Sequence, residues 1–364
     1  MEPYKQRKDS SRVPINERYI VQGYIAAGTY GKVYKAIEKS TQSLVAIKKF
    51  KNDAKDTEPL FHTGVTQSAI REMSLCRELQ HKHVSRLMHI HLERKCVYMV
   101  FEYAEHDLLQ VIHYHSHAEV PPLPLVSVKS ILSQLLHGLA YLHENRVLHR
   151  DLKPANIMVS ADGVVKIGDL GLARSFADPL NTLYAGDKVV VTIWYRAPEL
   201  LLGARHYTPA VDLWAVGCIL GELISLRPLF KGEETKMEIT GLNQKKHTTM
   251  PFQENQFLKI IQVLGTPTLD EWPSLQQYPE WQQLGKFTQF PKNLHAWYAN
   301  HCNYPDGVGP FKLLEKLLIY DPLKRVSAED AILDDWFFNE PNLRDNVFVM
   351  RYPKRKIHKG DSDL

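Results

Sequence analysis

Apolar and β-branched residues alternate with polar ones through much of the first hundred positions, which is the pattern of half-buried strands. The clearest runs cover residues 20–25, 32–37, 44–50 and 96–101. Residues 64–79 follow a different period. In that segment a broad helical stripe is shared by Val65, Ile70, Met73, Leu75 and Leu79. The pattern therefore predicts strands interrupted by one amphipathic helix.

After Tyr103 the apolar residues recur every three to four positions, which is the spacing of helices. Residues 126–144 form one such segment, with apolar side chains on a single face. Residues 213–226 are apolar nearly all round, as expected of a helix buried in a core. The second part of the chain is therefore predicted to be mostly helical.

Length and composition agree with a protein of two lobes. The 364 residues, 44% hydrophobic and 24% charged, exceed what one core usually sustains. We expect an α+β fold with a small β-rich lobe at residues 19–103 and a larger helical lobe at 104–338. Residues 1–18 are expected to be disordered or to contact a partner, and residues 339–364 to form a basic tail. A cleft between two lobes is the default place for a site.

Several classes of protein are excluded. The apolar stretch at 213–221 stops short of the roughly 18 residues that a membrane span needs, and the first dozen residues are too polar for a secretory signal. The four cysteines show no C-x-x-C pair, which indicates a reducing compartment, cytosol or nucleus. A net charge of only +4 predicts no direct binding of nucleic acid. We expect no membrane contact either.

The two ends of the chain, the segment at 232–253 and two histidine clusters each allow a purely structural interpretation and a functional one. The composition of residues 1–12 and 351–364 is that of disordered segments, although the basic end could also direct nuclear import or docking. Residues 232–253 are polar and predict a solvated loop or a docking surface. Histidines cluster at 81–91 and 113–117, but no cysteine or carboxylate set accompanies them at ligand spacing, so we predict no metal site there.

The first candidate motif is AAGTYGKV at residues 26–33, a turn in which Gly28 and Gly31 would let backbone N–H groups approach a phosphate. Taken alone, the motif predicts no more than a tight hairpin. It gains weight from VAIK at 45–48, because Lys48 could reach nucleotide phosphates and Glu72 could supply the carboxylate that holds it.

Three more motifs follow in order: LHRDLKPANIM at 148–158, KIGDLGLAR at 166–174 and WYRAPE at 194–199. Asp151 can accept the proton of an attacking hydroxyl, and Lys153 can neutralise charge on a phosphoryl group. Asn156 and Asp169 offer the hard oxygen ligands that Mg²⁺ prefers. Any one of these motifs could be an ordinary loop, but five in fixed order do not arise by chance.

The motifs together resemble those of the eukaryotic protein kinases over residues 19–338. The resemblance implies the bilobal protein kinase fold, ATP and Mg²⁺ as cofactors, a Lys48–Glu72 ion pair, a gatekeeper at Phe101 and a hinge at 102–104. The lysine two residues after Asp151, Lys153, resembles the lysine that serine/threonine kinases carry at this position and tyrosine kinases do not. The nucleotide-binding positions that it implies are Ile25, Gly28, Tyr30, Gly31, Val33, Ala46, Lys48, Phe101, Glu102, Ala104, Asp107, Asn156 and Asp169.

Within that family, SAIRE, which ends at Glu72, resembles the cyclin-binding helix of the cyclin-dependent kinases, and residues 189–203 resemble their substrate-binding segment. The resemblance implies Ser/Thr-Pro substrates, contacted by Val191, Thr192 and Arg196. It also implies that Glu199 pairs with Arg325 and that Asp212 supports the catalytic loop. Ala26 departs from the family, because a glycine usually begins the loop.

DLG at 169–171, Asp187 in place of a phosphorylated threonine, and YPKR at 352–355 resemble the Mediator-associated branch of the cyclin-dependent kinases. That resemblance implies a cyclin C-type cyclin and Mediator kinase-module subunits as partners. It also implies a nuclear location and, as substrates, the C-terminal repeats of RNA polymerase II and transcription factors.

The family resemblance also implies an anion cluster that orders the activation loop, formed by Arg71, Arg150, Arg174 and Asp187. Three guanidinium groups that gather in one place repel one another unless an anion joins them, and position 187 has no threonine that could carry a phosphate. We therefore expect that Asp187, or an acidic residue of a partner, supplies the anion. The competing hypotheses are an inactive kinase-fold scaffold and another kinase of the same group.

Overall fold

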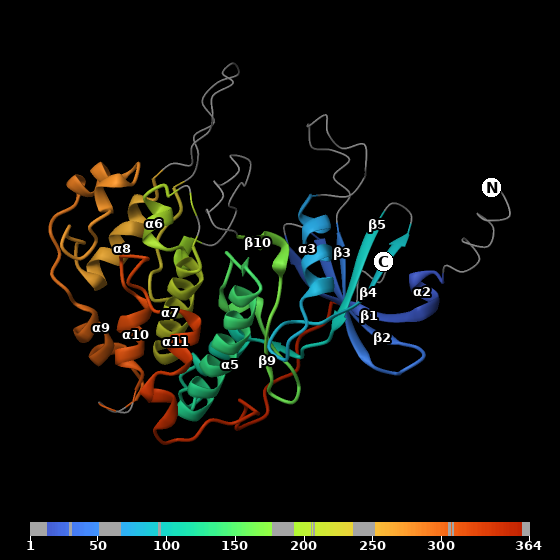
Figure 1. Cartoon of the computed structure of the whole chain (residues 1–364). Helices are drawn as coiled ribbons and strands as arrows, with labels where there is room; N and C mark the ends of the chain where they lie inside the picture. The colour runs from blue at the N-terminus through green and yellow to red at the C-terminus, as the bar shows by residue number, and fades with distance from the viewer. Residues whose placement is uncertain are drawn as a thin grey trace, which may run out of the picture.

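The computed structural model describes residues 13–28, 31–50, 67–93, 96–176, 193–204, 206, 208–235, 252–304, 307 and 309–358. Two lobes follow one another along the chain, and Figure 1 shows the sheet-rich lobe beside the helical one. The predicted change of pattern after Tyr103 lies one residue beyond the end of the last strand of the first sheet, Glu102.

The N-lobe is built on a five-stranded antiparallel sheet in the order β1-β2-β3-β5-β4. Its strands are β1 (Tyr19–Gly28), β2 (Gly31–Glu38), β3 (Leu44–Phe50), β4 (Leu87–Glu93) and β5 (Cys96–Glu102). The sequence pattern missed β4. This edge strand is partly exposed along nearly its whole length, so no buried face imposes an alternation of apolar and polar residues.

Alternation along the strands gives the sheet two apolar faces. One face packs Tyr34, Ile47 and Val100 into a small cluster on the outside of the N-lobe. The other face, with Met99 and Val97, packs toward helix α3 (Gln67–Glu78) and joins the main core. Lys48 follows Ile47, so its side chain points to the opposite face, into the space between the lobes.

The N-terminal segment is partly ordered. A short helix, α2 (Ile15–Arg18), precedes β1, and Ile15 is buried in the outer cluster of the N-lobe. Its backbone N–H donates to Glu93 Oε2 at 3.0 Å. Residues 15–18 are therefore not disordered, because Ile15 packs into the apolar cluster on the outer face of the sheet, while contact of this segment with a partner stays a prediction. Residues 1–12 lie outside the described part.

Helices dominate the C-lobe: α4 (Leu108–His115), α5 (Leu125–Glu144), α6 (Pro198–Leu201), α7 (Ala210–Ser225), α8 (Glu254–Leu264), α9 (Leu294–His301), α10 (Phe311–Leu317) and α11 (Ala328–Ile332). Every residue of α7 from Val211 to Ser225 is buried, as its apolar composition predicted. By length and hydropathy α5 alone, among the described helices, could cross a membrane. Since 72% of its apolar window is buried inside the protein, we regard it as a core helix.

Short strands and short 3-10 segments complete the C-lobe, and those between residues 147 and 195 carry the sequence motifs. The strands are β6 (His106–Asp107), β7 (Val147–Leu148), β8 (Ile157–Val159), β9 (Val165–Ile167) and β10 (Arg174–Ser175), and the 3-10 turns are η1 (Pro154–Asn156), η2 (Leu170–Leu172), η3 (Ile193–Tyr195), η4 (Leu275–Gln277), η5 (Trp281–Lys286) and η6 (Asp335–Phe338). The pair β8–β9 places the RDLKPAN and DLG motifs side by side.

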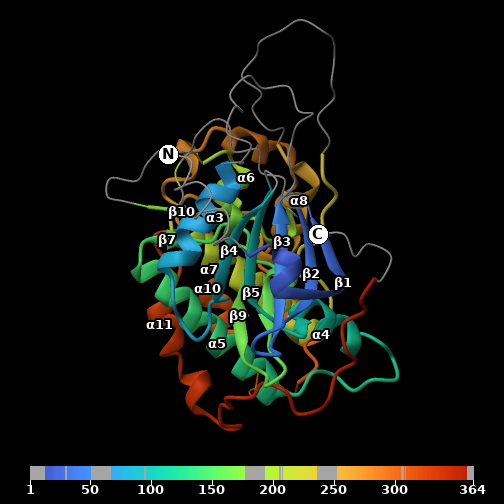
Figure 2. The same cartoon turned by 90° about the vertical axis from the view of Figure 1, so that its right-hand side faces the viewer.

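The C-terminal segment follows the C-lobe surface and returns to the N-lobe, as Figure 2 shows below α11 and up toward β1. Val347 is buried and its N–H donates to Gly163 O at 3.0 Å. Farther along, His358 forms a bridge with Tyr24 of β1. The prediction of disorder at 351–364 is therefore wrong for residues 351–358, because composition does not show the surface that receives them. Residues 359–364 lie outside the description.

Candidate active site

A cleft of about 470 Å³ lies between the lobes, and most of the predicted nucleotide residues line it. Its walls include Ile25, Gly31, Val33, Ala46, Lys48, Phe101, Glu102, Ala104, Asp107, Asn156 and Asp169, together with the predicted catalytic residues Glu72, Asp151 and Lys153. Sequence reasoning missed Met158, Leu172 and Arg355 as lining residues. Arg355 lies far along the chain and no motif indicates its place in this cleft.

The two glycines of the first motif pair with each other, Gly28 at the end of β1 with Gly31 at the start of β2. A Cβ atom on Gly31 would lie 2.0 Å from the carbonyl oxygen of Lys49, so the packing of β2 against β3 excludes any larger residue. The packing of the strands therefore explains why position 31 is glycine, without any contact to a phosphate. Ala26 also lines the cleft, while Tyr30 lies outside the described residues.

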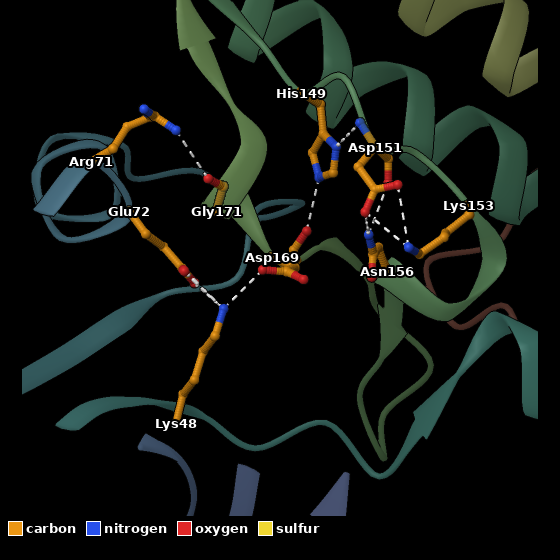
Figure 3. A network of polar contacts seen from close by, with 10 residues as sticks. Lys48, Arg71, Glu72, His149, Asp151, Lys153, Asn156, Asp169 and Gly171 are labelled. Atoms are coloured by element: carbon orange, nitrogen blue, oxygen red, sulfur yellow. Dashed lines mark hydrogen bonds and ion pairs between the residues drawn. The ribbon is translucent and has the colours of Figure 1, made fainter. Parts of the chain in front are cut away.

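Lys48 stands at the centre of an ion triplet (Figure 3). Its ammonium lies 2.8 Å from both Oε1 and Oε2 of Glu72, and 2.8 Å from Oδ1 of Asp169. Burial disfavours the charged ammonium, but the two carboxylates outweigh it and raise the pKa of Lys48. The structure thus brings together β3, α3 and the DLG motif through one cation that stays charged.

Asp169 takes the left-handed backbone conformation, with φ of 56°. A non-glycine residue there carries backbone strain, which is common at functional sites. Burial opposes its ionisation, but Lys48 holds the pKa of Asp169 below its ordinary value. Leu170, which replaces the commoner phenylalanine, is buried in the core beside it. The strained aspartate is therefore a carboxylate aimed into the cleft.

The catalytic loop is fixed from beneath by Asp212 of α7. Oδ2 of Asp212 accepts the backbone N–H of His149 at 2.9 Å, and Oδ1 accepts that of Arg150 at 2.8 Å. Burial opposes the charge, but hydrogen bonding from His143 lowers the pKa of Asp212. Arg150 has a φ of 70°, which these bonds maintain. A buried carboxylate thereby determines the course of the loop.

Asp151 receives two side-chain donors (Figure 3). Nζ of Lys153 lies 2.9 Å from its Oδ2, and Nδ2 of Asn156 lies 3.0 Å from the same oxygen. Nδ2 of Asn156 also donates to the carbonyl oxygen of Asp151 at 2.8 Å. His149 joins the loop to the DLG motif, since its Nε2 lies 2.8 Å from Gly168 O. The carboxylate is oriented before any substrate arrives.

Asn156 and Asp169 suit a magnesium ion of the kind that substrate phosphates complete. Both hydrogens of the Asn156 amide are directed at Asp151, which leaves its Oδ1 as an acceptor. Asp169 engages Lys48 through Oδ1. In the part of the chain that the structure describes, no three His, Cys, Asp or Glu residues gather to hold a metal by themselves. Mg²⁺ commonly binds one or two protein oxygens together with phosphates and water.

Asp107 is occupied by protein groups at the mouth of the cleft. Its Oδ1 caps α4 by accepting the N–H of Gln110, and its Oδ2 lies 2.6 Å from a guanidinium nitrogen of Arg355. Burial raises the pKa of Asp107, and the Arg355 guanidinium opposes that shift. Glu102, at the end of β5, forms an ion pair with Lys166 at 2.9 Å.

One other implied contact is present, a further contact of Arg71 was not predicted, and several predicted residues are not placed. Glu199 and Arg325 form a buried bidentate ion pair at 2.9 and 3.1 Å. Arg71 donates to the carbonyl oxygen of Gly171 at 3.3 Å. Arg150, Arg174 and Arg196 lie in the described part, but Asp187, Val191 and Thr192 lie outside it. The anion cluster and the substrate contacts therefore stay predictions.

Known proteins with similar sequences are protein kinases. The protein kinase domain family matches residues 19–337. The chain is 55% identical over 388 residues to serine/threonine-protein kinase SSN3 of Scheffersomyces stipitis, covering 100% of this chain and 87% of that protein. It is 48% identical over 446 residues to meiotic mRNA stability protein kinase SSN3 of Saccharomyces cerevisiae, covering 100% of this chain and 79% of that protein.

A solved structure shows the same fold. The crystal structure of the yeast RNA Pol II CTD kinase CTDK-1 complex contains a chain that matches with a TM-score of 0.75 and 32% sequence identity. The match covers 93% of this chain and 98% of that one. The fold, the ordered cleft and these relatives agree with one another. The chain belongs to the protein kinase family and is a serine/threonine protein kinase.

Proposed function

We propose that this kinase is cyclin-dependent and transfers the γ-phosphoryl group of ATP to Ser/Thr-Pro sites. The proposed substrates are the C-terminal repeats of RNA polymerase II and transcription factors, modified in the nucleus as part of the Mediator kinase module. The observation that carries the catalytic part is the Lys48 triplet, because it joins α3, β3 and the DLG motif. The 32% identical chain of a polymerase kinase complex supports the substrate class.

In the proposed reaction Asp151 orients the substrate hydroxyl and accepts its proton. The donors from Lys153 and Asn156 hold this carboxylate in place, so little reorganisation accompanies proton transfer. Lys153 also places a positive charge where the phosphoryl group passes. Lys48 positions the nucleotide phosphates, while Glu72 and Asp169 fix the ammonium.

Magnesium would be held by Asn156 and Asp169, and when bound it neutralises charge on the transferred phosphate. The apolar part of the cleft, formed by Ile25, Val33 and Ala46, would cover the adenine next to the hinge. No residue of this catalytic set is missing. An inactive scaffold would have no chemical use for the complete set.

The α3 helix is the proposed contact of a cyclin C-type partner. Ile70, within the SAIRE motif, is 50% exposed, whereas Glu72, two residues farther along the same helix, is buried. An apolar residue held outward on this helix can be buried by a partner. Since Glu72 moves with the helix, a partner that fixes α3 also fixes Lys48.

A phosphotransfer assay on a polymerase-tail peptide, with and without cyclin C, tests this function. We expect phosphorylation to depend on the cyclin and to be absent from the Asp151→Asn control. Equal rates of phosphorylation with and without cyclin C would refute the proposal that the kinase depends on this partner. Activity on a peptide with alanine after the acceptor serine, equal to that on the Ser-Pro peptide, would refute the substrate class.

We propose that Asp187, or an acidic residue of a partner, supplies the anion for Arg71, Arg150 and Arg174. One carboxylate carries less charge than a phosphate, which adds about −1.5 to −2 charges. Asp187→Ala should lower the activity of the cyclin complex partly if a partner contributes the main anion, and severely if it does not. A purified complex that stays inactive until Thr182 or Thr192 is phosphorylated would contradict the proposal.

A further inference from the structure

A second cavity of about 480 Å³ lies next to the nucleotide cleft. Helix α4 forms one wall, and the extended segment at 352–358 forms the other. Ile25 and Arg355 line both cavities, so the two share a wall. We call this second cavity the tail cleft. Nothing in the catalytic mechanism uses it.

The segment that forms the outer wall is fixed at three points. The hydroxyl of Tyr352 lies 2.8 Å from Nε2 of His115, and Arg355 pairs with Asp107 at 2.6 Å. His358 exchanges backbone hydrogen bonds with Tyr24 at 3.0 and 3.2 Å. These anchors lie three residues apart, so the backbone between them has little freedom. The side chains at 354 and 356 are therefore presented from a backbone that is fixed on both sides.

The charges of this wall are unbalanced. Lys354 and Lys356 are exposed, line the cavity and have no hydrogen bond or ion pair within the described residues. Arg355 differs from them because Asp107 neutralises it. Among the described residues that line the tail cleft, none is acidic. Two like charges two residues apart repel each other unless an anion lies between them.

The opposite wall adds donors of another kind. His113 and His117 of the α4 region are both exposed and line the cavity. A neutral imidazole still offers one N–H, and a protonated one offers two. An anion in the cleft would therefore meet ammonium groups on one side and imidazoles on the other. Because the tail is already ordered, little conformational entropy is lost on binding.

We propose that the tail cleft binds an acidic or phosphorylated segment of a protein substrate, a few residues away from the serine or threonine that is modified. The inference rests on the proposed function, which requires an extended polypeptide to reach Asp151. The shared wall places the bound anion beside the mouth of the cleft that receives ATP. A substrate that already carries phosphate would then be preferred over an unmodified one.

The test compares three Ser-Pro peptides with one acceptor, in which a distant position is phosphoserine, glutamate or serine. The enzymes are the cyclin complexes of the parent, the double variant Lys354→Ala/Lys356→Ala, and a matched control, Lys286→Ala/Lys312→Ala. The control removes the same charge from exposed sites outside the cleft. Phosphoserine and glutamate separate a phosphate requirement from a general need for negative charge.

For the parent and the control, we expect kcat/KM for the phosphorylated peptide to exceed that for the serine peptide by about tenfold, mainly through KM. The Lys354/Lys356 variant should lose this preference and keep the parental rate on the serine peptide. An equal loss in the control variant would refute the proposal, because it would show a general charge effect. A parent with no preference would also refute it.

A binding measurement separates this inference from the proposed function. Fluorescence anisotropy of the phosphorylated peptide, with the parent and the double variant, should show binding that the lysine substitutions weaken, even if no peptide is phosphorylated. If the phosphorylated peptide binds through the two lysines but no peptide is phosphorylated, the result contradicts the proposed reaction and leaves the peptide site supported. Binding that is displaced by oligouridylate more readily than by excess phosphopeptide would refute a peptide as the occupant.

Discussion

Glu222 of α7 is a buried carboxyl group with one identified partner. The hydroxyl of Tyr195 donates to its Oε2 at 2.6 Å, and the residue is 2% exposed. Burial raises the pKa of Glu222 from its ordinary value of 4.5 to about 6, and the hydrogen bond from Tyr195 limits that increase. The side chain joins the WYRAPE motif to the core helix of the C-lobe, so its charge affects stability directly.

The direction of the pH dependence follows from proton binding. Between the unfolded and folded pKa values, the folded state binds more protons than the unfolded state, so stability decreases as pH rises from 4.5 to about 6. A tenfold change in an acid dissociation constant corresponds to about 1.4 kcal/mol, so the ionised carboxylate costs about 2 kcal/mol above the window. Well below pH 4.5 both states are protonated and the cost is absent.

Glu222→Gln removes this titration and keeps the shape and an acceptor for Tyr195. We expect the free energy of unfolding of the variant, relative to the parent, to increase by about 2 kcal/mol between pH 4 and pH 7.5. Urea unfolding of both proteins across that range measures the difference. The other ionisable groups are common to both proteins and cancel. Any constant offset from the new amide does not change with pH.

Tyr195→Phe is the control. Without the hydroxyl donor the carboxylate loses its stabilising bond, so its pKa should rise further and the window should extend above pH 6. A difference between the Gln variant and the parent that stays flat over the whole range would refute the argument. So would a difference that shrinks as pH rises.

Three further substitutions test the site and its support. Asp151→Asn should abolish phosphotransfer while ATP affinity, measured by calorimetry, stays within a few-fold of the parent, because this carboxylate acts on the hydroxyl. Turnover comparable to that of the parent would refute the proposal that Asp151 accepts the proton of the substrate hydroxyl. Lys48→Arg should lose most of the activity in the same assay, since a planar guanidinium does not reproduce a point charge shared with Glu72; parental rates would contradict this. Arg325→Ala should lower the free energy of unfolding by about 3 to 5 kcal/mol in urea, because it leaves the Glu199 carboxylate buried and unpaired. A loss below about 1 kcal/mol would show that water reaches the site.

The order of the sequence motifs was sufficient to predict that Lys48, Glu72, Asp151, Lys153, Asn156 and Asp169 line one cleft. Lys48 follows a strand alternation that directs it between the lobes, and Asp151, Lys153 and Asn156 are held close together by the loop that contains them. Local spacing determines such arrangements, because few backbone conformations join residues two or five positions apart. The two main core helices were predictable for a similar reason, since their apolar period is long and regular.

The course of the C-terminal segment was decided by tertiary structure. Its composition resembles that of a disordered tail, yet Arg355 reaches Asp107 across 248 residues of sequence. The partner of a charged side chain depends on which surfaces the fold brings close, and no local pattern records that. The edge strand β4 was missed because its half-exposed residues follow no period. The tail cleft exists only where α4 and this distant segment meet, so its charge becomes visible once the chain has folded.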